Sequence, residues 1–171
     1  MLGWDMPQTL YAFLAAQHIS YQRFDHAPVF NCAEASAIIP DLPGAETKNL
    51  FLKAGKSGRY LLICLPAAQR LDLKACAELL QIKGLGFASP ERLQQALGLT
   101  PGAVSLLAVI NDQAGVVDVI IDPILLQHPA VLCHPLHNSS TLAVATGDLL
   151  RFLQLTAHPP RLLALPLLPS G

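Results

Sequence analysis

The sequence predicts an α+β fold: a single domain in which helices flank a mixed, curved β-sheet. Helical and strand-like segments interleave along the chain without the regular β–α–β repeat of a doubly wound parallel sheet. The length of 171 residues favours one domain over residues 1–171, with its core at about 7–165, and 52% hydrophobic residues are ample to fill that core.

The amino-terminal segment predicts a helix followed by a short strand. Leu10, Phe13 and Leu14 recur at helical spacing, and Pro7 suits the first turn. Residues 21–25 then predict a strand, and Asn31 is a suitable cap for a second short helix.

A hairpin is the next predicted element. Residues 47–54 and 59–65 are strand-like, and the turn Gly55-Lys56-Ser57-Gly58 separates them. Lys48 is therefore expected near the end of a strand, close to a loop.

Capping residues indicate two further helices. Asp72 is a good N-cap for a helix over 73–81. Ser89-Pro90 opens another helix that Gly98 closes, following the preference for proline at helix starts and glycine just past helix ends.

The remaining elements are mainly strands. Residues 104–111 and 116–122 are rich in β-branched side chains and flank a short polar turn, which predicts a second hairpin. A strand over 141–145 precedes a helix that Thr146 caps and that runs to residue 155. Residues 162–165 are expected to add an edge strand before a proline-rich tail.

Composition excludes several classes of protein. Eleven Lys and Arg against twelve Asp and Glu give a net charge of −1, unlike a protein that grips long DNA or RNA by neutralising phosphates. No stretch approaches the ~20 apolar residues of a membrane span, and no signal-type segment opens the chain, so the expected location is the cytoplasm. The basic residues Lys48, Lys53, Lys56 and Arg59 are consistent with a local RNA contact or with a solvated hairpin.

Cysteine spacing argues against a zinc site and against a disulfide-stapled scaffold. Cys32, Cys64, Cys76 and Cys133 include no CxxC pair. We therefore expect buried free thiols.

Four short motifs carry the functional signal: ETKNLFL at 46–52, GLTPGAVS at 98–105, IND at 110–112 and HPLHN at 134–138. With these motifs, over roughly residues 7–165, the chain resembles the YbaK-type aminoacyl-tRNA deacylases, stand-alone relatives of the prolyl-tRNA synthetase editing domain. The resemblance implies hydrolysis of a mischarged tRNA. The first and last motifs look closer to the branch that edits alanyl-tRNA(Pro).

The resemblance implies that Lys48 is the catalytic residue. Its ammonium group would hold the terminal adenosine or stabilise negative charge on the ester carbonyl. The residues alone favour an ordinary surface lysine, and it is the resemblance that reverses this interpretation. Asn49, expected to bind substrate, follows directly, and adjacent side chains of a strand point to opposite faces. Asn49 therefore either shares the pocket through a local irregularity or braces a neighbouring loop.

The remaining substrate-binding residues are expected in two loops. In the family, a loop that begins with glycine presents backbone groups to the aminoacyl moiety. A proline commonly closes that loop, whereas this sequence has Leu106. The difference affects the expected shape of the pocket and therefore the choice of substrate. The same stretch is consistent with a simple turn. His134 is either a proton shuttle or a hydrogen-bonded structural group. The matching residues are Gly102, Ala103, Val104, Ser105 and Leu106 in the first loop and His134 and Asn138 in the second.

No metal or cofactor is expected. The spacing of His128, Cys133, His134 and His137 fits no familiar metal site, and the chain has neither a Gly-x-Ser-x-Gly elbow nor a phosphate-binding loop. The expected partner is the acceptor end of a mischarged tRNA, with prolyl-tRNA synthetase as a further candidate. Two alternatives stay open: a deacylase for cysteinyl- or seryl-tRNA, and a non-catalytic module that binds tRNA or a synthetase. A purely structural role leaves the motifs unexplained.

Overall fold

The computed structural model describes residues 6–28 and 42–169. Its helices, 3-10 helices (η) and strands are, in chain order, α1 (Met6–Ala16), β1 (Tyr21–Asp25), β2 (Thr47–Ala54), β3 (Tyr60–Pro66), β4 (Gln69–Leu71), α3 (Leu73–Leu80), β5 (Leu85–Phe87), α4 (Pro90–Leu97), η2 (Pro101–Ala103), η3 (Leu106–Asn111), β6 (Val117–Ile121), η4 (Pro123–Gln127), β7 (Ala130–Cys133), β8 (Ser140–Ala145), α5 (Thr146–Leu155), β9 (Arg161–Leu162) and β10 (Leu167–Pro169).

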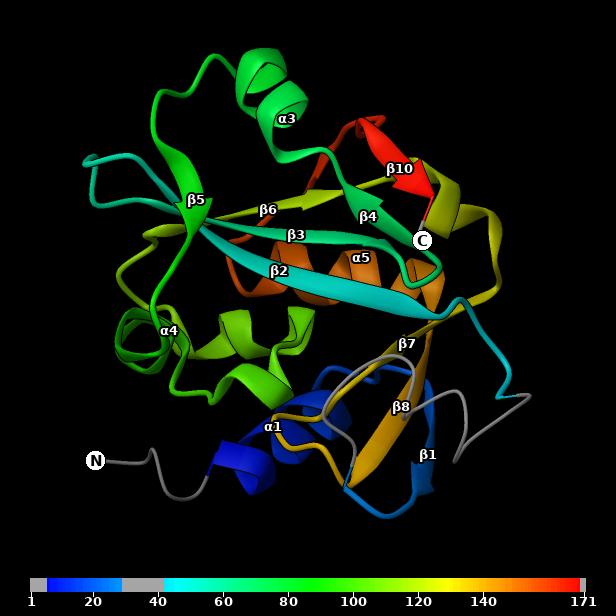
Figure 1. The fold of residues 1–171 in the computed structure, drawn as a ribbon. Coiled ribbons are helices and arrows are strands. Elements are labelled where there is room, and N and C mark those ends of the chain that lie inside the picture. The colour runs from blue at the N-terminus through cyan, green and yellow to red at the C-terminus, as the bar shows by residue number, and fades with distance from the viewer. Residues whose placement is uncertain (1–5, 29–41, 170–171) are drawn as a thin grey trace.

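A five-stranded mixed sheet with the order β5-β2-β3-β6-β9 is the centre of the fold (Figure 1). β2 pairs antiparallel with β3 and β5, whereas β6 runs parallel to β3 and β9. α3 and the antiparallel ribbon β4–β10 lie over one face. α4 and α5 lie on the other face, beyond which come α1 and a three-stranded sheet of order β1-β8-β7. The predicted α+β class with a mixed sheet is confirmed.

Alternation along β3 divides the interior into two hydrophobic clusters. Tyr60, Leu62 and Cys64 face the main cluster, which α1, α4, α5 and the three-stranded sheet complete. Leu61, Ile63 and Leu65 face a smaller cluster beneath α3. Both faces of the strand are buried, as expected for a central strand covered on two sides. The same rule applies to β2, which pairs with β3: a side chain that packs in the main cluster lies on one face of the sheet, and a side chain that packs in the smaller cluster lies on the other.

The predicted caps of α3 and α4 are confirmed. Asp72 accepts a hydrogen bond from the backbone N–H of Ala75 (3.1 Å) at the start of α3. Ser89 accepts one from the N–H of Arg92 (3.2 Å) at the start of α4, and Gly98 ends α4 in the left-handed region (φ 70°). These residues satisfy backbone groups that a helix end leaves unpaired.

The predicted hairpin over 104–111 and 116–122 is wrong, although its second strand is confirmed as β6. In place of the first strand, the chain forms η3 over 106–111 just after η2, and β6 pairs in parallel with β3. Ser105 caps η3 by accepting a hydrogen bond from the N–H of Leu107 (3.1 Å), and η3 buries its apolar run in the main cluster. A short apolar run does not distinguish a buried strand from a buried helical turn, so tertiary packing decided the outcome.

The other predicted elements within the described residues are present in the structure, with differences in one helix cap and in the bounds of one strand. α1, β1, the β2–β3 hairpin, β8 and α5 are confirmed, while the helix capped by Asn31 lies outside the described residues. Thr146 is the first residue of α5 rather than its cap, and its hydroxyl donates to the carbonyl of His128 (2.6 Å). The edge strand near 162–165 is β9, which ends at Leu162.

The turn between β2 and β3 requires glycine at position 55. Gly55 has a φ of 60°, and a Cβ there would lie 2.5 Å from the carbonyl oxygen of Lys83. We expect Gly55→Ala to lower the free energy of unfolding by about 2 kcal/mol or more, because the clash adds to the ~1 kcal/mol of a left-handed alanine. Urea denaturation of Gly55→Ala and Gly58→Ala measures the difference. Gly58 (φ 79°) has open space around it, so equal losses in the two variants would contradict the steric argument.

Candidate active site at the start of β2

The first half of β2 is an edge of the five-stranded sheet. β5 covers the outer side of β2 only over Leu52–Ala54, and among the described residues no strand continues this pairing toward Thr47. Residues 47–50 are all half-buried, whereas Phe51 and Leu52 are buried. β7 adjoins this end, because Ala45 bridges Val131 and the Thr47 hydroxyl donates to the carbonyl of Leu132 (2.9 Å). The two signature motifs around Lys48 and His134 therefore belong to adjacent segments.

Lys48 lies on the face of β2 that the smaller cluster covers. Lys48 pairs with Leu65, a member of that cluster. Leu50 and Leu52, which lie two and four residues further along β2 and so on the same face, also pack in that cluster. Its Nζ atom donates a hydrogen bond to the carbonyl of Gln69, at the start of β4, over 2.7 Å. The half-buried ammonium is thus held beside the ribbon β4–β10.

Asn49 points to the opposite face, as alternation predicts. It pairs with Cys64, a member of the main cluster. Its Oδ1 atom is buried and has no hydrogen-bond partner among the described residues. An unpaired buried acceptor is costly and uncommon in folded proteins, so this oxygen is a candidate ligand-binding group.

The glycine-started loop forms part of the main cluster rather than an open rim. Gly102 and Val104 are half-buried, and Ala103, Ser105 and Leu106 are buried. The Ser105 hydroxyl caps η3, and Leu106 is 1% exposed. Leu106 can therefore influence the shape of a neighbouring pocket only through the residues that pack against it, because its own side chain is not exposed. The side chain of Lys48 does not share this loop's side of the sheet, whereas that of Asn49 does.

His134 follows β7 and is held by the loop that leads to β8. Its Nδ1 atom lies 3.3 Å from the carbonyl of Ser140, an arrangement in which Nδ1–H donates, and its Nε2 has no partner among the described residues. Burial lowers the pKa of His134 below its ordinary value, so the ring is neutral near pH 7 and Nε2 can accept a proton. Asn138 lies half-buried in the same loop.

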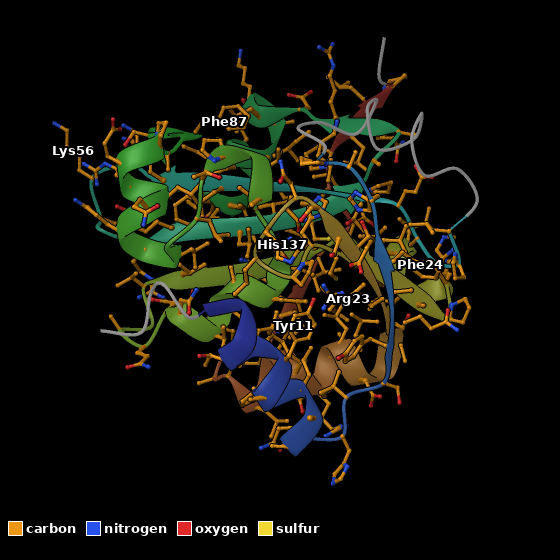
Figure 2. The ribbon with its side chains drawn as sticks, turned by 90° about the horizontal axis from the view of Figure 1, so that it is seen from below. Tyr11, Arg23, Phe24, Lys56, Phe87 and His137 are labelled. Atoms are coloured by element: carbon orange, nitrogen blue, oxygen red, sulfur yellow. The ribbon has the colours of Figure 1, made fainter. Side chains whose placement is uncertain are left out.

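A polar cluster next to this loop was not predicted from sequence. Asp25 accepts hydrogen bonds from Ser140 Oγ (2.6 Å) and Arg23 Nε (2.8 Å), and the bond from Ser140 is the main reason its pKa is lowered. The Arg23 guanidinium lies 5.0 Å from the centre of the Tyr11 ring, and Figure 2 shows both residues near His137. Ser140 joins this cluster to His134 through its carbonyl. No local sequence signal links residues from α1, β1 and β8.

The model of the aminoacyl-tRNA editing domain family matches residues 26–152. The chain belongs to this family. Prolyl-tRNA editing protein ProX of Acetoanaerobium sticklandii is 35% identical over 145 residues, covering 85% of this chain and 88% of that protein. Prolyl-tRNA synthetase associated domain-containing protein 1 of Danio rerio is 33% identical over 162 residues, covering 94% of this chain and 88% of that protein.

The fold agrees with that of a solved structure. The crystal structure of hypothetical protein APE2540 superposes with a TM-score of 0.69 at 18% identity, covering 88% of this editing-domain chain and 95% of that one. The match over 26–152 includes all four motifs that carried the resemblance. The predicted family is therefore confirmed.

The buried cysteines of this editing domain are poor nucleophiles. Cys64, Cys76 and Cys133 are free and buried, as predicted, and Cys32 lies outside the described residues. Burial raises the pKa of Cys64, and it raises the pKa of Cys133 to about 12, so both thiols stay protonated. In the described part of the chain, no group of three His, Cys, Asp or Glu side chains is placed to hold a metal ion, and no helix could span a membrane.

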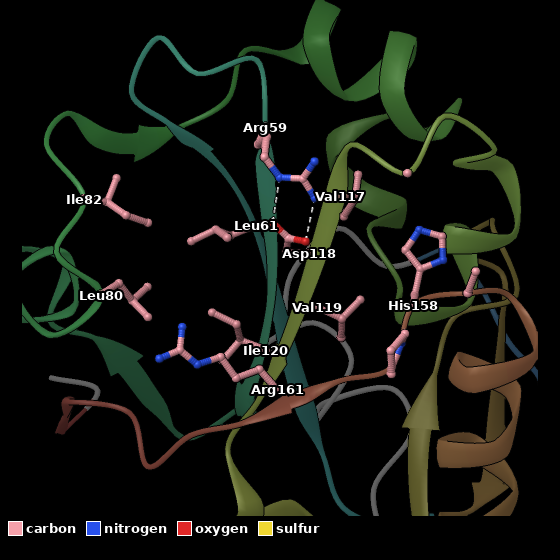
Figure 3. Close-up of a pocket in the computed structure, with 13 residues that line it drawn as sticks. Arg59, Leu61, Leu80, Ile82, Val117, Asp118, Val119, Ile120, His158 and Arg161 are labelled. Carbon is pink, nitrogen blue, oxygen red and sulfur yellow. Dashed lines mark hydrogen bonds and ion pairs between the residues drawn. The ribbon is translucent and has the colours of Figure 1, made fainter.

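A groove of about 400 Å³ lies elsewhere on the molecule, along β6 and β9 (Figure 3). Leu61 and Ile120 contribute apolar lining, and Arg59 donates two hydrogen bonds to Asp118 across β3 and β6. His158 lies at its other side. None of the residues predicted for catalysis or substrate binding lines this groove.

Proposed function

We propose that this chain is a trans-editing deacylase that hydrolyses mischarged aminoacyl-tRNA, with alanyl-tRNA(Pro) as its substrate. The observation that carries the proposal is the 35% identity to a prolyl-tRNA editing protein over 85% of the chain, which includes the motif around Lys48. A synthetase site large enough for proline cannot exclude alanine, because a missing methylene is worth only about 1–3 kcal/mol. A second site is needed after the mischarged tRNA is released, in the cytoplasm where tRNA is charged.

The edge position of Lys48 and Asn49 explains how two side chains on opposite faces can serve one substrate. A ligand that lies across the uncovered edge of β2 meets both faces of the sheet. On the Lys48 side, the ammonium binds the phosphate or ribose of the terminal adenosine, or the carbonyl oxygen as it gains negative charge. On the Asn49 side, the unpaired Oδ1 accepts a hydrogen bond from the amino group of alanine.

The reaction is a direct hydrolysis of the ester. A water oxygen attacks the carbonyl carbon, the bond to the ribose oxygen breaks, and that oxygen takes a proton, leaving free alanine and intact tRNA. The neighbouring ribose hydroxyl, with His134 Nε2 as a further acceptor, orients and activates the water. No covalent enzyme intermediate is required.

The identity of the amino acid is tested by comparing substrates. We expect the wild-type protein to hydrolyse alanyl-tRNA(Pro) and to spare prolyl-tRNA(Pro). Because Leu106 replaces a common proline, seryl- and cysteinyl-tRNA belong in the same assay. Faster hydrolysis of either would reassign the substrate, whereas saturable tRNA binding without turnover would identify a non-catalytic module, with prolyl-tRNA synthetase as its candidate partner.

Asn49→Leu separates a functional amide from a structural one. We expect kcat/KM for alanyl-tRNA(Pro) to fall about 10- to 100-fold, the equivalent of one hydrogen bond to a charged group. The free energy of unfolding should stay constant or rise, because the variant removes a buried oxygen that has no partner among the described residues. Deacylation assays and urea denaturation give the two quantities. A marked loss of stability with unchanged activity would show that the amide only supports the fold.

A further inference from the structure

Basic residues are concentrated in one continuous stretch of the chain. Residues 48–92 hold eight Lys or Arg and three Asp or Glu, a net charge of +5, while the rest of the chain carries −6. This stretch forms β2, β3, β4, α3, β5 and the start of α4, the cyan and green elements of Figure 1. The overall charge of −1 thus conceals an uneven distribution of charge along the chain, and such asymmetry is typical of proteins that bind nucleic acid.

Three lysines of this stretch meet where the β2–β3 turn packs on β5. The backbone N–H of Gly55 donates to the carbonyl of Gly84 (3.2 Å), which brings Lys56 near Lys83. Lys53 lies opposite Gly86 in the β2–β5 ladder. All three lysines are exposed, and none forms an ion pair with a described carboxylate.

An exposed aromatic side chain completes this surface. Phe87, in β5, is 63% exposed, and β5 pairs only with β2 in the described sheet. Figure 2 shows Phe87 and Lys56 at the periphery, away from Tyr11, Arg23 and His137. We name Lys53, Lys56, Lys83 and Phe87 the cationic edge. The strand pairing places the Phe87 ring on the face of Leu52 and the Lys53 side chain on the opposite face, so the two side chains border this edge of the sheet from its two sides. Lysines attract phosphates and an exposed ring stacks bases, so both suit a nucleic acid that lies over the edge.

We propose that the cationic edge binds the backbone of the tRNA acceptor stem while the aminoacyl end occupies the start of β2. This inference rests on the proposed function. β2 connects the two places, because Lys53 lies five residues, or about 17 Å, beyond Lys48 along the extended strand. The surface therefore holds the tRNA body at a distance from the reacting ester and contributes to KM rather than to kcat.

The test uses the full chain and uncharged tRNA(Pro), so that no turnover is needed. Binding is measured by fluorescence anisotropy between about 50 and 200 mM salt. For Lys56→Gln/Lys83→Gln we expect binding about 10-fold weaker, and a slope of log K against log[salt] smaller by about 2, one per lost phosphate contact. The control Lys74→Gln/Arg161→Gln removes the same charge from exposed positions on α3 and β9 and should bind nearly as the wild type does.

Activity assays separate this surface from the reaction centre. For alanyl-tRNA(Pro), the double lysine variant should show a KM about 10-fold higher with unchanged kcat, while alanine esterified to adenosine alone should be hydrolysed at the wild-type rate. Phe87→Ser should weaken binding of uncharged tRNA without changing the salt slope. Equal effects in the two double variants would overturn the proposal. So would unchanged RNA affinity with dimerisation of the lysine variant, since edge lysines also prevent strand pairing between copies.

Discussion

Replacing Lys48 with alanine is expected to lower kcat/KM for alanyl-tRNA(Pro) by about 100- to 1,000-fold, the usual loss when one fixed group that stabilises an oxyanion is removed. The carbonyl of Gln69 holds the ammonium in place (2.7 Å), so its charge is positioned before the substrate binds. Stability should change by no more than about 1 kcal/mol, because only one hydrogen bond of a half-buried side chain is lost. Single-turnover deacylation and urea denaturation measure the two effects.

Lys53→Ala is the matched control for this prediction. Lys53 lies on the same strand but is exposed. Because side chains alternate along a strand and the two lysines are five residues apart, Lys53 points to the opposite face from Lys48. Because Lys53 belongs to the cationic edge, its loss should raise KM and leave kcat unchanged, whereas loss of Lys48 should lower kcat. Lys48→Arg should recover little activity, because a planar guanidinium does not reproduce a compact ammonium charge. Wild-type turnover by Lys48→Ala would remove Lys48 from the mechanism.

Asp112→Ala is expected to lower the free energy of unfolding by about 3–5 kcal/mol, because it leaves several buried hydrogen-bond donors without their acceptor. Asp112 accepts hydrogen bonds from His158 Nε2 (2.8 Å) and from the N–H groups of Val116 and Val117, and both partners of the Asp–His pair are 2% exposed at the side chain. The His158 Nδ1 atom lies 2.6 Å from the carbonyl of Thr156, so the ring ties the end of α5 to the start of β6.

Asp118→Ala provides the comparison. Asp118 pairs with Arg59 at the surface, where the two side chains are 52% and 48% exposed, so its removal should cost less than about 1 kcal/mol. Thermal unfolding should therefore show a shift of roughly 10 °C for Asp112→Ala and of a few degrees at most for Asp118→Ala. Similar small shifts in both variants would contradict a structural role for the buried pair.

Local signals predicted the elements that are locally determined. The β2–β3 hairpin follows from its alternation and its glycine turn, and α3 and α4 follow from their caps. Residues 104–111 were mispredicted because a mainly apolar run fits a buried strand and a buried helical turn equally well. The parallel pairing of β6 with β3 depends on chain segments more than fifty residues apart, and no local pattern encodes it.

The candidate site was only partly accessible to sequence reasoning. Strand alternation correctly placed Lys48 and Asn49 on opposite faces, but it could not indicate that β5 leaves this part of β2 uncovered. The contact of β2 with β7, which brings the motif of His134 next to that of Lys48, is likewise a long-range effect. The pairing of Asp112 with His158 and the cluster around Asp25 arise only from the tertiary fold.

The central claim is that the substrate's aminoacyl end binds across the start of β2. It is tested most directly by two-dimensional NMR titration with a stable amide analogue of 3′-alanyl-adenosine. We predict that the backbone amide signals of residues 48–50, 102–105 and 134 shift together and saturate at one dissociation constant. Shifts confined to the groove between Arg59 and His158, with residues 48–50 unchanged, would contradict it.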